Sequence, residues 1–143
     1  MVKIYTKNFE KTQDLICTWD GTHLYDGPYT YSHKILYTFD GKYMYRGRDK
    51  KTQNIIATWD GSRIYVGVNE KSNYTKMTVK NGYVYHSVFE KTQDIVFSIK
   101  DNILYDGQFP QSGKLLVKSD QNIPEIVLIW AYLKPSNTYL PWF

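Results

Sequence analysis

Three histidines and one cysteine are the residues best suited to catalysis or metal binding, and their spacing predicts no reactive site. His23, His33 and His86 fall at different places in the internal repeat of the chain, which gives them no common metal site. A His-Glu-x-x-His motif and paired Cys/His spacing are both missing. No Ser-His-Asp arrangement, phosphate-binding glycine loop or pair of carboxylates can be argued from spacing. We therefore predict no catalytic residue, no metal ligand and no cofactor, and a protein that is not an enzyme.

Recurring aspartates also resemble catalytic groups, but each belongs to a turn. Asp20, Asp40 and Asp60 precede glycine, and Asp-Gly between strand-forming segments is a strong hairpin signal. Asp101 serves a turn in the same way. Cys17 is the only cysteine, so no intrachain disulfide can form, and we expect it to be a small buried hydrophobic residue.

These turns belong to a twenty-residue unit that repeats six times without an insertion. The first marker of the unit is an apolar residue followed by tyrosine, at Ile4-Tyr5, Leu24-Tyr25, Met44-Tyr45, Ile64-Tyr65, Val84-Tyr85 and Leu104-Tyr105. A second marker is a hydroxyl residue, at Thr12, Ser32, Thr52, Ser72, Thr92 and Ser112. We expect this hydroxyl to form a local hydrogen bond with the backbone of a turn.

Each unit predicts two antiparallel strands. Residues 14–19 and 22–25 are strand-forming, and the Asp20-Gly21 turn between them predicts a type I′ hairpin with positive φ at both residues. Asn81-Gly82 and Asp101-Asn102 place the same turn one residue later, which preserves the two faces of the sheet. A longer polar connection joins one unit to the next. Six units therefore predict twelve strands in a meander.

Alternation of side chains assigns the two faces of these strands. The inner face is predicted to carry the apolar residues at positions equivalent to 15, 17, 19 and 24 of the first unit, which include Trp19, Phe39 and Trp59. The outer face carries Thr18, Thr38, Thr58, Thr78 and Ser98 together with the six tyrosines. Ile16 and its equivalents are apolar too, so the predicted outer face is only half polar.

The last part of the chain predicts a buried helix. Asn122 and Glu125 match an N-cap and its capping-box partner, with Pro124 in the first turn, and the apolar run 126–133 follows. A thirteenth buried strand is the alternative. A helix that is apolar on every side must be buried all round. We expect residues 1–122 to form the repeat domain, with residues 123–143 packed in that same domain.

These elements predict an all-β fold, in which a closed barrel of about twelve antiparallel strands surrounds the C-terminal helix. Barrels with more than about eight strands leave an interior cavity, and a helix is about 10–12 Å wide. An open β-hairpin solenoid is the alternative fold.

Twelve antiparallel strands around a hydrophobic C-terminal helix resemble the tubby-like architecture, which includes phosphoinositide-binding and scramblase-related proteins. The resemblance covers nearly the whole chain, concerns architecture only and assigns no residue a role. The segment 38–43, Thr-Phe-Asp-Gly-Lys-Tyr, also resembles the twenty-residue repeats of choline-binding proteins and toxins, which form open solenoids.

Two surfaces are candidates for binding. The six tyrosines, Tyr5, Tyr25, Tyr45, Tyr65, Tyr85 and Tyr105, offer amphipathic rings for a protein or a carbohydrate; cross-strand pairing with the threonines explains the same pattern structurally. Arg46, Arg48, Lys50 and Lys51 form a basic patch for an anionic lipid or a nucleic acid, which we rank second, and a solvated loop is the structural explanation there. The apolar residues 139–143 are expected to plug one end of the barrel.

Composition limits the remaining possibilities. The net charge of +4 and the pI of about 9.0 are mild, and the chain contains no basic tail. No secretory signal or transmembrane segment is evident in the sequence. We therefore expect a cytoplasmic binding or scaffold module whose partner the sequence does not identify. An enzyme with an unrecognised site, at a barrel mouth, is the third hypothesis.

Overall fold

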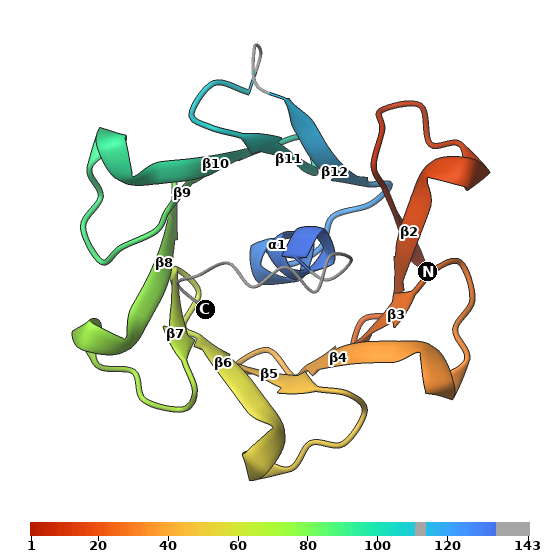
Figure 1. Cartoon of the computed structure of the whole chain (residues 1–143), viewed down its shortest axis with the longest axis horizontal. Coiled ribbons are helices and arrows are strands. Elements are labelled where there is room, and N and C mark those ends of the chain that lie inside the picture. The colour runs from red at the N-terminus through yellow and green to blue at the C-terminus, as the bar shows by residue number, and fades with distance from the viewer. Residues whose placement is uncertain (111–113, 134–143) are drawn as a thin grey trace.

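A ring of twelve antiparallel strands closes around one helix in the computed structural model, which describes residues 1–110 and 114–133 (Figure 1). The strands are β1 (Val2–Tyr5), β2 (Leu15–Trp19), β3 (His23–Asp26), β4 (Ile35–Phe39), β5 (Tyr43–Arg46), β6 (Ile55–Trp59), β7 (Arg63–Val66), β8 (Thr75–Lys80), β9 (Tyr83–Tyr85), β10 (Ile95–Lys100), β11 (Ile103–Asp106) and β12 (Leu115–Ser119). Each strand pairs with its neighbours in sequence, and β1 pairs with β12. The closed barrel is confirmed, and the open solenoid is excluded.

The ring closes where β1 pairs with β12, two strands that are far apart in the sequence. Ile4 pairs with Ser119, just as Leu24 pairs with Trp19 within the first continuous hairpin. Asp120 Oδ1 accepts a hydrogen bond from Lys3 N at 2.9 Å. This contact repeats the one between Asp20 and the backbone of His23 in the continuous hairpin. The repeat signal therefore also specifies how the ends of the ring meet.

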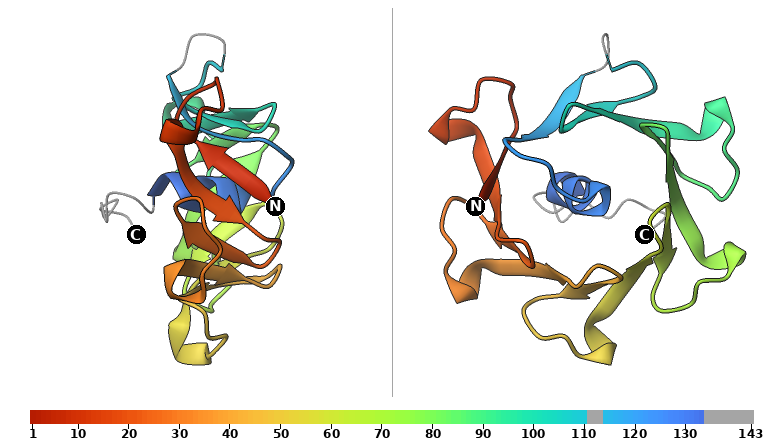
Figure 2. Two further views of the ribbon diagram at one scale, coloured as in Figure 1. Left: turned by 90° about the vertical axis from the view of Figure 1, so that its right-hand side faces the viewer. Right: turned by 180° about the vertical axis from the view of Figure 1, so that it is seen from behind.

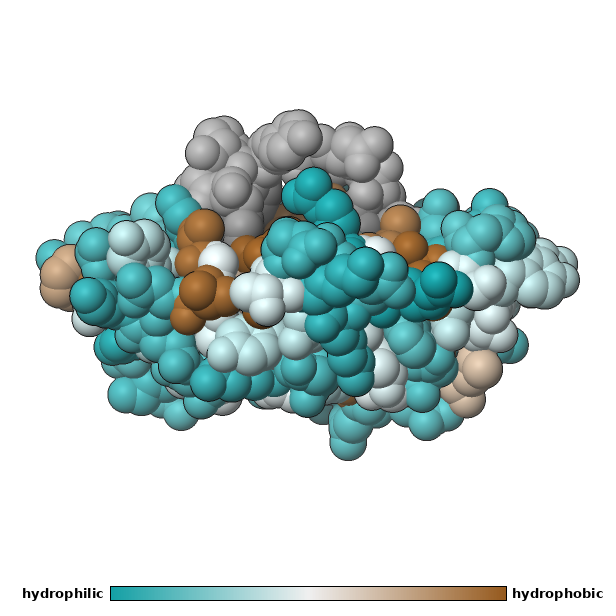
Figure 3. All heavy atoms as spheres, turned by 90° about the horizontal axis from the view of Figure 1, so that it is seen from below, coloured by the Kyte–Doolittle hydropathy of each residue, from teal (hydrophilic) through white to brown (hydrophobic). Residues whose placement is uncertain are grey.

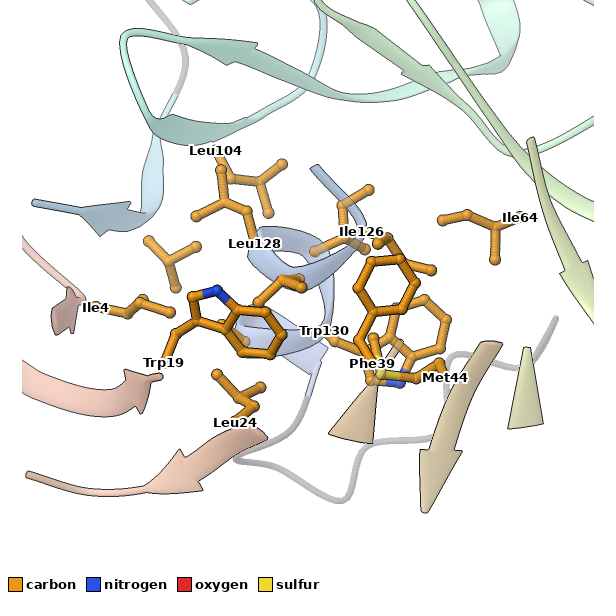
Figure 4. Packing of buried hydrophobic residues seen from close by; sticks show 14 of the residues in the cluster. Ile4, Trp19, Leu24, Phe39, Met44, Ile64, Leu104, Ile126, Leu128 and Trp130 are labelled. Atoms are coloured by element: carbon orange, nitrogen blue, oxygen red, sulfur yellow. The ribbon is translucent and has the colours of Figure 1, made fainter. Parts of the chain in front are cut away.

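The helix α1 (Glu125–Leu133) occupies the centre of the barrel (Figures 1 and 2). Its residues 126–131 are all buried, and side chains of the wall point toward them (Figure 4). Trp130 meets the ring of Tyr37 edge-on, with centroids 6.4 Å apart. The predicted helix is confirmed, but Asn122 is not its N-cap: Pro124 O accepts hydrogen bonds from Val127 N and Leu128 N, at 2.9 and 3.2 Å, and the helix begins at Glu125.

A β-bulge at position 16 of the repeat corrects the predicted faces. Ile4 pairs with Cys17 but Tyr5 pairs with Leu15, so Ile16 is an extra residue between these two pairs. The bulge turns Ile16 toward the core cluster, whereas Leu15 lies on the face of Tyr5. The same shift recurs in the other strand pairs with this register. The prediction was therefore wrong at positions 15 and 16 and right at 17, 19 and 24.

The hairpin turns also differ from the prediction. In the first three turns only the glycine has positive φ, about +100° at Gly21 and Gly41, and the aspartate does not. The Asp20 carboxylate instead accepts hydrogen bonds from Thr22 N and His23 N, at 2.8 and 2.6 Å. The turn therefore centres on residues 21 and 22, in the same place as Asn81-Gly82 in its own repeat. The expected one-residue displacement of the later turns does not occur.

Six outer loops join the hairpins, and we number them 1 to 6 in chain order: 6–14, 27–34, 47–54, 67–74, 86–94 and 107–114. Loops 1 to 5 each end in a 3-10 helix, namely Thr12–Asp14, Ser32–Lys34, Thr52–Asn54, Ser72–Tyr74 and Thr92–Asp94. A backbone bond closes each helix, such as Asp14 N to Lys11 O at 2.9 Å, in place of the predicted bond from the hydroxyl residue. Loops 1 to 5 lie along the circumference of the ring (Figure 1).

Candidate binding surface

The six predicted tyrosines do not form an exposed surface. Tyr5, Tyr25 and Tyr45 are each 7% exposed and Tyr65 is 4% exposed, whereas Tyr85 and Tyr105 are half-buried. The rings do lie on the outer face of the wall, where Thr18 pairs with Tyr25 and its equivalents pair likewise. The structural explanation, cross-strand pairing, therefore accounts for the position of all but Tyr5, which pairs with Lys118.

Outer loops cover this tyrosine-bearing face. Thr18 Oγ1 donates to Gly27 O at 2.8 Å, and Thr38 Oγ1 donates to Gly47 O at 2.7 Å, so the starts of loops 2 and 3 are fastened to the wall. Thr58 and Thr78 hold the next loops in the same way. Sequence alternation alone places these tyrosines outside but cannot show that a loop lies over them.

Three of the six tyrosine hydroxyls form hydrogen bonds within their own hairpins. Tyr25 Oη donates to Asp20 Oδ2 at 2.7 Å, and Tyr45 and Tyr65 repeat this contact with Asp40 and Asp60. Burial, followed by the hydrogen bond and the charge of Asp20, raises the pKa of Tyr25 to about 12. Burial also acts to raise the pKa of Asp20, but hydrogen bonds from the backbone of His23, the Tyr25 hydroxyl and the backbone of Thr22 outweigh it and lower the pKa to about 2. The lowered pKa of Asp20 and the raised pKa of Tyr25 therefore both reflect hydrogen bonding that stabilises the turn.

The predicted basic patch is exposed. Arg46, Arg48, Lys50 and Lys51 are all solvent-accessible, at the end of β5 and in outer loop 3. Arg48 Nε lies 3.5 Å from Asp49 Oδ1, and both side chains are more than half exposed, so this ion pair contributes little stability. The patch therefore keeps most of its positive charge for an external partner.

Outer loops also present aromatic residues that the sequence reasoning missed. Phe9, Tyr29, Phe89 and Phe109 occupy the same position of the repeat and are 78%, 60%, 61% and 59% exposed. Because loop 6 is followed around the ring by loop 1, these residues lie on four consecutive loops, 5, 6, 1 and 2. Their twenty-residue spacing was the signal that could have revealed them.

Loop 2 carries a column of stacked rings. The centroids of Tyr29 and Tyr31 are 5.4 Å apart with an interplanar angle of 21°, and those of Tyr31 and His33 are 5.7 Å apart with an angle of 9°. All three residues are exposed. We call Tyr29, Tyr31 and His33 the ring column.

The end of the barrel at the hairpin turns has two hollows. The larger, about 550 Å³, lies between Asn102, Ser119 and Leu128. The smaller, about 350 Å³, lies beside Trp19, Phe39 and Lys50. Within residues 1–110 and 114–133, no group of His, Cys, Asp or Glu side chains has the arrangement of a metal site.

The larger hollow follows from the size of one inner position. Trp19, Phe39 and Trp59 fill this end of the barrel in the first three repeats, whereas Ile99 and Ser119 leave room where the chain crosses to α1. Burial raises the pKa of Glu125 at the edge of this hollow. The smaller side chains at this position therefore account for the hollow.

These features define a class of protein: a closed six-fold ring of β-hairpins around a helix, with divergent outer loops. A family model described as "6-fold beta flower protein" matches residues 4–130. The chain belongs to this family, whose description names an architecture and no reaction.

Comparison with curated proteins and with solved structures gives no match. The resemblance to tubby-like proteins therefore extends to the strand number and the central helix alone. No helix among the described residues has the length and hydrophobicity required to cross a membrane.

Proposed function

We propose that the protein is a non-catalytic binding module that contacts a partner protein through Phe9, Phe89 and Phe109. These three residues lie on consecutive outer loops, 5, 6 and 1, and each ring is more than half exposed. Large exposed apolar side chains that recur together favour a contact surface.

The repeats supply the observation that carries this proposal. Loops 3 and 4 have Asp49 and Asn69 where the other loops have an aromatic ring, yet both form the same 3-10 helix as loops 1, 2 and 5 and share the positive-φ glycine of loops 2 and 6. The outer loop therefore folds without an apolar residue at this position. Folding does not require an aromatic ring at this position, and an exposed apolar ring is unfavourable in water. Binding to a partner best explains its presence.

A protein partner fits the spacing and the chemistry better than a glycan. Neighbouring loops are separated by two strands, a distance of about 10 Å at the wall, so three rings cover about 20 Å. That width suits a protein interface. Phenylalanine offers apolar area without a hydrogen-bonding group, whereas sugar hydroxyls need polar partners.

The test replaces the rings with the residue that loop 3 carries. Tagged wild-type protein and a Phe9→Asp, Phe89→Asp, Phe109→Asp variant are used to capture proteins, and each candidate partner is then purified and titrated by calorimetry. A Thr12→Asp, Thr92→Asp, Gln108→Asp variant is the matched control, because it adds the same charge to the same loops and keeps the rings.

We expect a purified partner to bind wild type and control alike, and to bind the ring-deficient variant at least about 100-fold more weakly, since anchors of this kind contribute about 1–2 kcal/mol or more each. Equal binding to all three proteins contradicts the proposal. Ring-dependent attachment to lipid vesicles, or ring-dependent self-association, without a separate protein partner also contradicts it.

A further inference from the structure

Loops 2 and 3 together form a second surface, with different chemistry. The geometry points to a binding site for single-stranded nucleic acid there, with bases stacking on the ring column and phosphates contacting Arg46, Arg48, Lys50 and Lys51. The site uses none of the three phenylalanines above. Its failure would therefore leave the proposed protein contact untouched.

The ring column has the form of a stacking platform. Tyr29 and Tyr31 are 60% and 55% exposed, and the near-parallel planes of Tyr31 and His33, 9° apart, extend the stack by a third ring. A base added to either end continues this stack. Base–aromatic stacking contributes about 1–3 kcal/mol per base and tolerates any sequence, because every base has a π-face.

Comparison with the other repeats shows that folding does not require this column. The position of Tyr31 is occupied by lysine in four other loops, at Lys11, Lys51, Lys71 and Lys91. In loop 5 the ammonium of Lys91 lies 5.3 Å from the ring centroid of Phe89, where loop 2 stacks Tyr31 on Tyr29. Loop 2 therefore has a stack of three rings where loop 5 has a cation–aromatic contact.

Positive charge is concentrated on the adjacent loop. Residues 46–54 contain four cationic side chains and one carboxylate, whereas no other outer loop contains more than two lysines or arginines. In the part of the chain that the structure describes, the ion pair between Arg48 and Asp49 is the only one within 4.0 Å that the basic patch makes. Positive charge beside an aromatic stack is the combination that holds single strands, through backbone phosphates and bases respectively.

The ring places the two loops next to each other. Only the hairpin β4–β5 separates them in the strand order, and they are neighbours on the circumference in Figure 1. Two strand spacings amount to about 10 Å at the wall. A short single strand can therefore contact both loops at once. A duplex would hide the faces of its bases from the ring column, and a lipid headgroup has no aromatic face to stack.

Fluorescence anisotropy with a labelled oligothymidylate of about 15 nucleotides, within the range of known site sizes, tests the site. The key variant is Tyr31→Lys, His33→Gln, which gives loop 2 the residues of loop 1. This variant gains a positive charge, so weaker binding must come from lost stacking. We expect a loss of about 5- to 150-fold, whereas Tyr31→Phe, which keeps the ring, should bind like wild type.

The charge component is tested by salt dependence. Arg48→Ala, Lys50→Ala should lower the salt slope by about 1.4, since each phosphate contact on a single strand contributes about 0.7. Lys71→Ala, Lys91→Ala removes equal charge elsewhere on the ring and should change the slope less. No binding at low salt, or equal binding by wild type and Tyr31→Lys, His33→Gln, overturns the inference. Binding to anionic vesicles but not to the oligonucleotide would also overturn it.

Discussion

The inner wall and the outer loops of this ring are built from the same repeats but tolerate very different variation. The apolar residue before each tyrosine is at most 1% exposed in all six copies, and only its shape changes, from Val84 to Met44. In the loops one position varies from Phe9 to Asp49 to Asn69. Packing against α1 constrains the wall, whereas the side chain at this loop position lies outside the hydrophobic core. The divergence of the loops is therefore where binding specificity is expected.

Removal of the helix should have the largest effect. A chain ending at Asn122 loses the six buried residues of α1. At about 1.5–3 kcal/mol for each large apolar side chain, the loss is about 10 kcal/mol, comparable with the whole stability of a domain. We expect no cooperative thermal transition by circular dichroism. A cooperative melt at the wild-type temperature would show that the wall is stable without its core.

Substitutions within the helix sharpen this test. Ile129 is fully buried, so Ile129→Asp places an unpaired charge in the core and should abolish cooperative folding. Glu125→Gln, at the largely exposed start of the same helix, removes a charge whose pKa is raised by partial burial, and should change the free energy of unfolding by less than about 0.5 kcal/mol.

Removal of a turn aspartate should have a smaller effect. Asp20 accepts hydrogen bonds from Thr22 N, His23 N and the Tyr25 hydroxyl. Asp20→Ala should lower the free energy of unfolding by about 2–3 kcal/mol, and Tyr25→Phe, which removes one of these bonds, by about 1 kcal/mol. Chemical denaturation measures both. Equal losses for the two variants would mean that the backbone contacts contribute nothing.

The charge of Asp20 makes this stabilisation depend on pH. Its pKa falls from the ordinary 3.8 to about 2 in the folded protein, so the contribution is complete above pH 4 and disappears as the pH falls through 2. Asp20→Asn keeps an acceptor for the turn amides but has no charge. We expect wild type to be more stable than Asp20→Asn by about 1 kcal/mol at pH 7 and equally stable at a pH well below 2. A constant difference across this range would contradict the assignment.

A turn glycine should have an effect of similar or smaller size. Gly41 has a φ of +100°, and no atom lies within 4 Å of an added Cβ, so the cost of Gly41→Val comes from the backbone alone. We expect a loss of about 1–3 kcal/mol. Lys42→Ala, the next residue, should change stability by less than about 0.5 kcal/mol. Equal stabilities for the two variants would count against the turn geometry.

Much of the architecture was predictable because the same strand and turn signals recur from repeat to repeat. The twenty-residue period, the Asp-Gly turns and the apolar run 126–133 together predict the strand number, the pairing and the central helix. Leu15 and Ile16 were assigned to the wrong faces because both are apolar, and a bulge between them leaves no mark in the alternation. The Asp20-Gly21 pair predicted a type I′ turn with positive φ at both residues. In the structure the Asp20 side chain accepts backbone hydrogen bonds instead, and the sequence pattern does not distinguish these two roles.

The candidate surfaces were less predictable, for a physical reason. Tyr25 lies on the outer face as predicted, but a loop fastened through Thr18 covers that face, and this cover is a tertiary contact. Phe9 and Tyr29 lie in polar loops, where composition gives no reason to expect exposed rings. The basic patch was predictable because its charges cluster along the sequence. The position of the ring column beside the basic patch depends on the order of loops around the ring.

The smallest expected effect tests the central claim most directly. Thermal and chemical denaturation of the Phe9→Asp, Phe89→Asp, Phe109→Asp variant separates folding from binding in the outer loops. We expect a free energy of unfolding within about 0.5 kcal/mol of wild type per site, because loop 3 folds with Asp49 at the same position. A loss of several kcal/mol would show that the rings stabilise the folded loops, which would contradict a role limited to binding a partner.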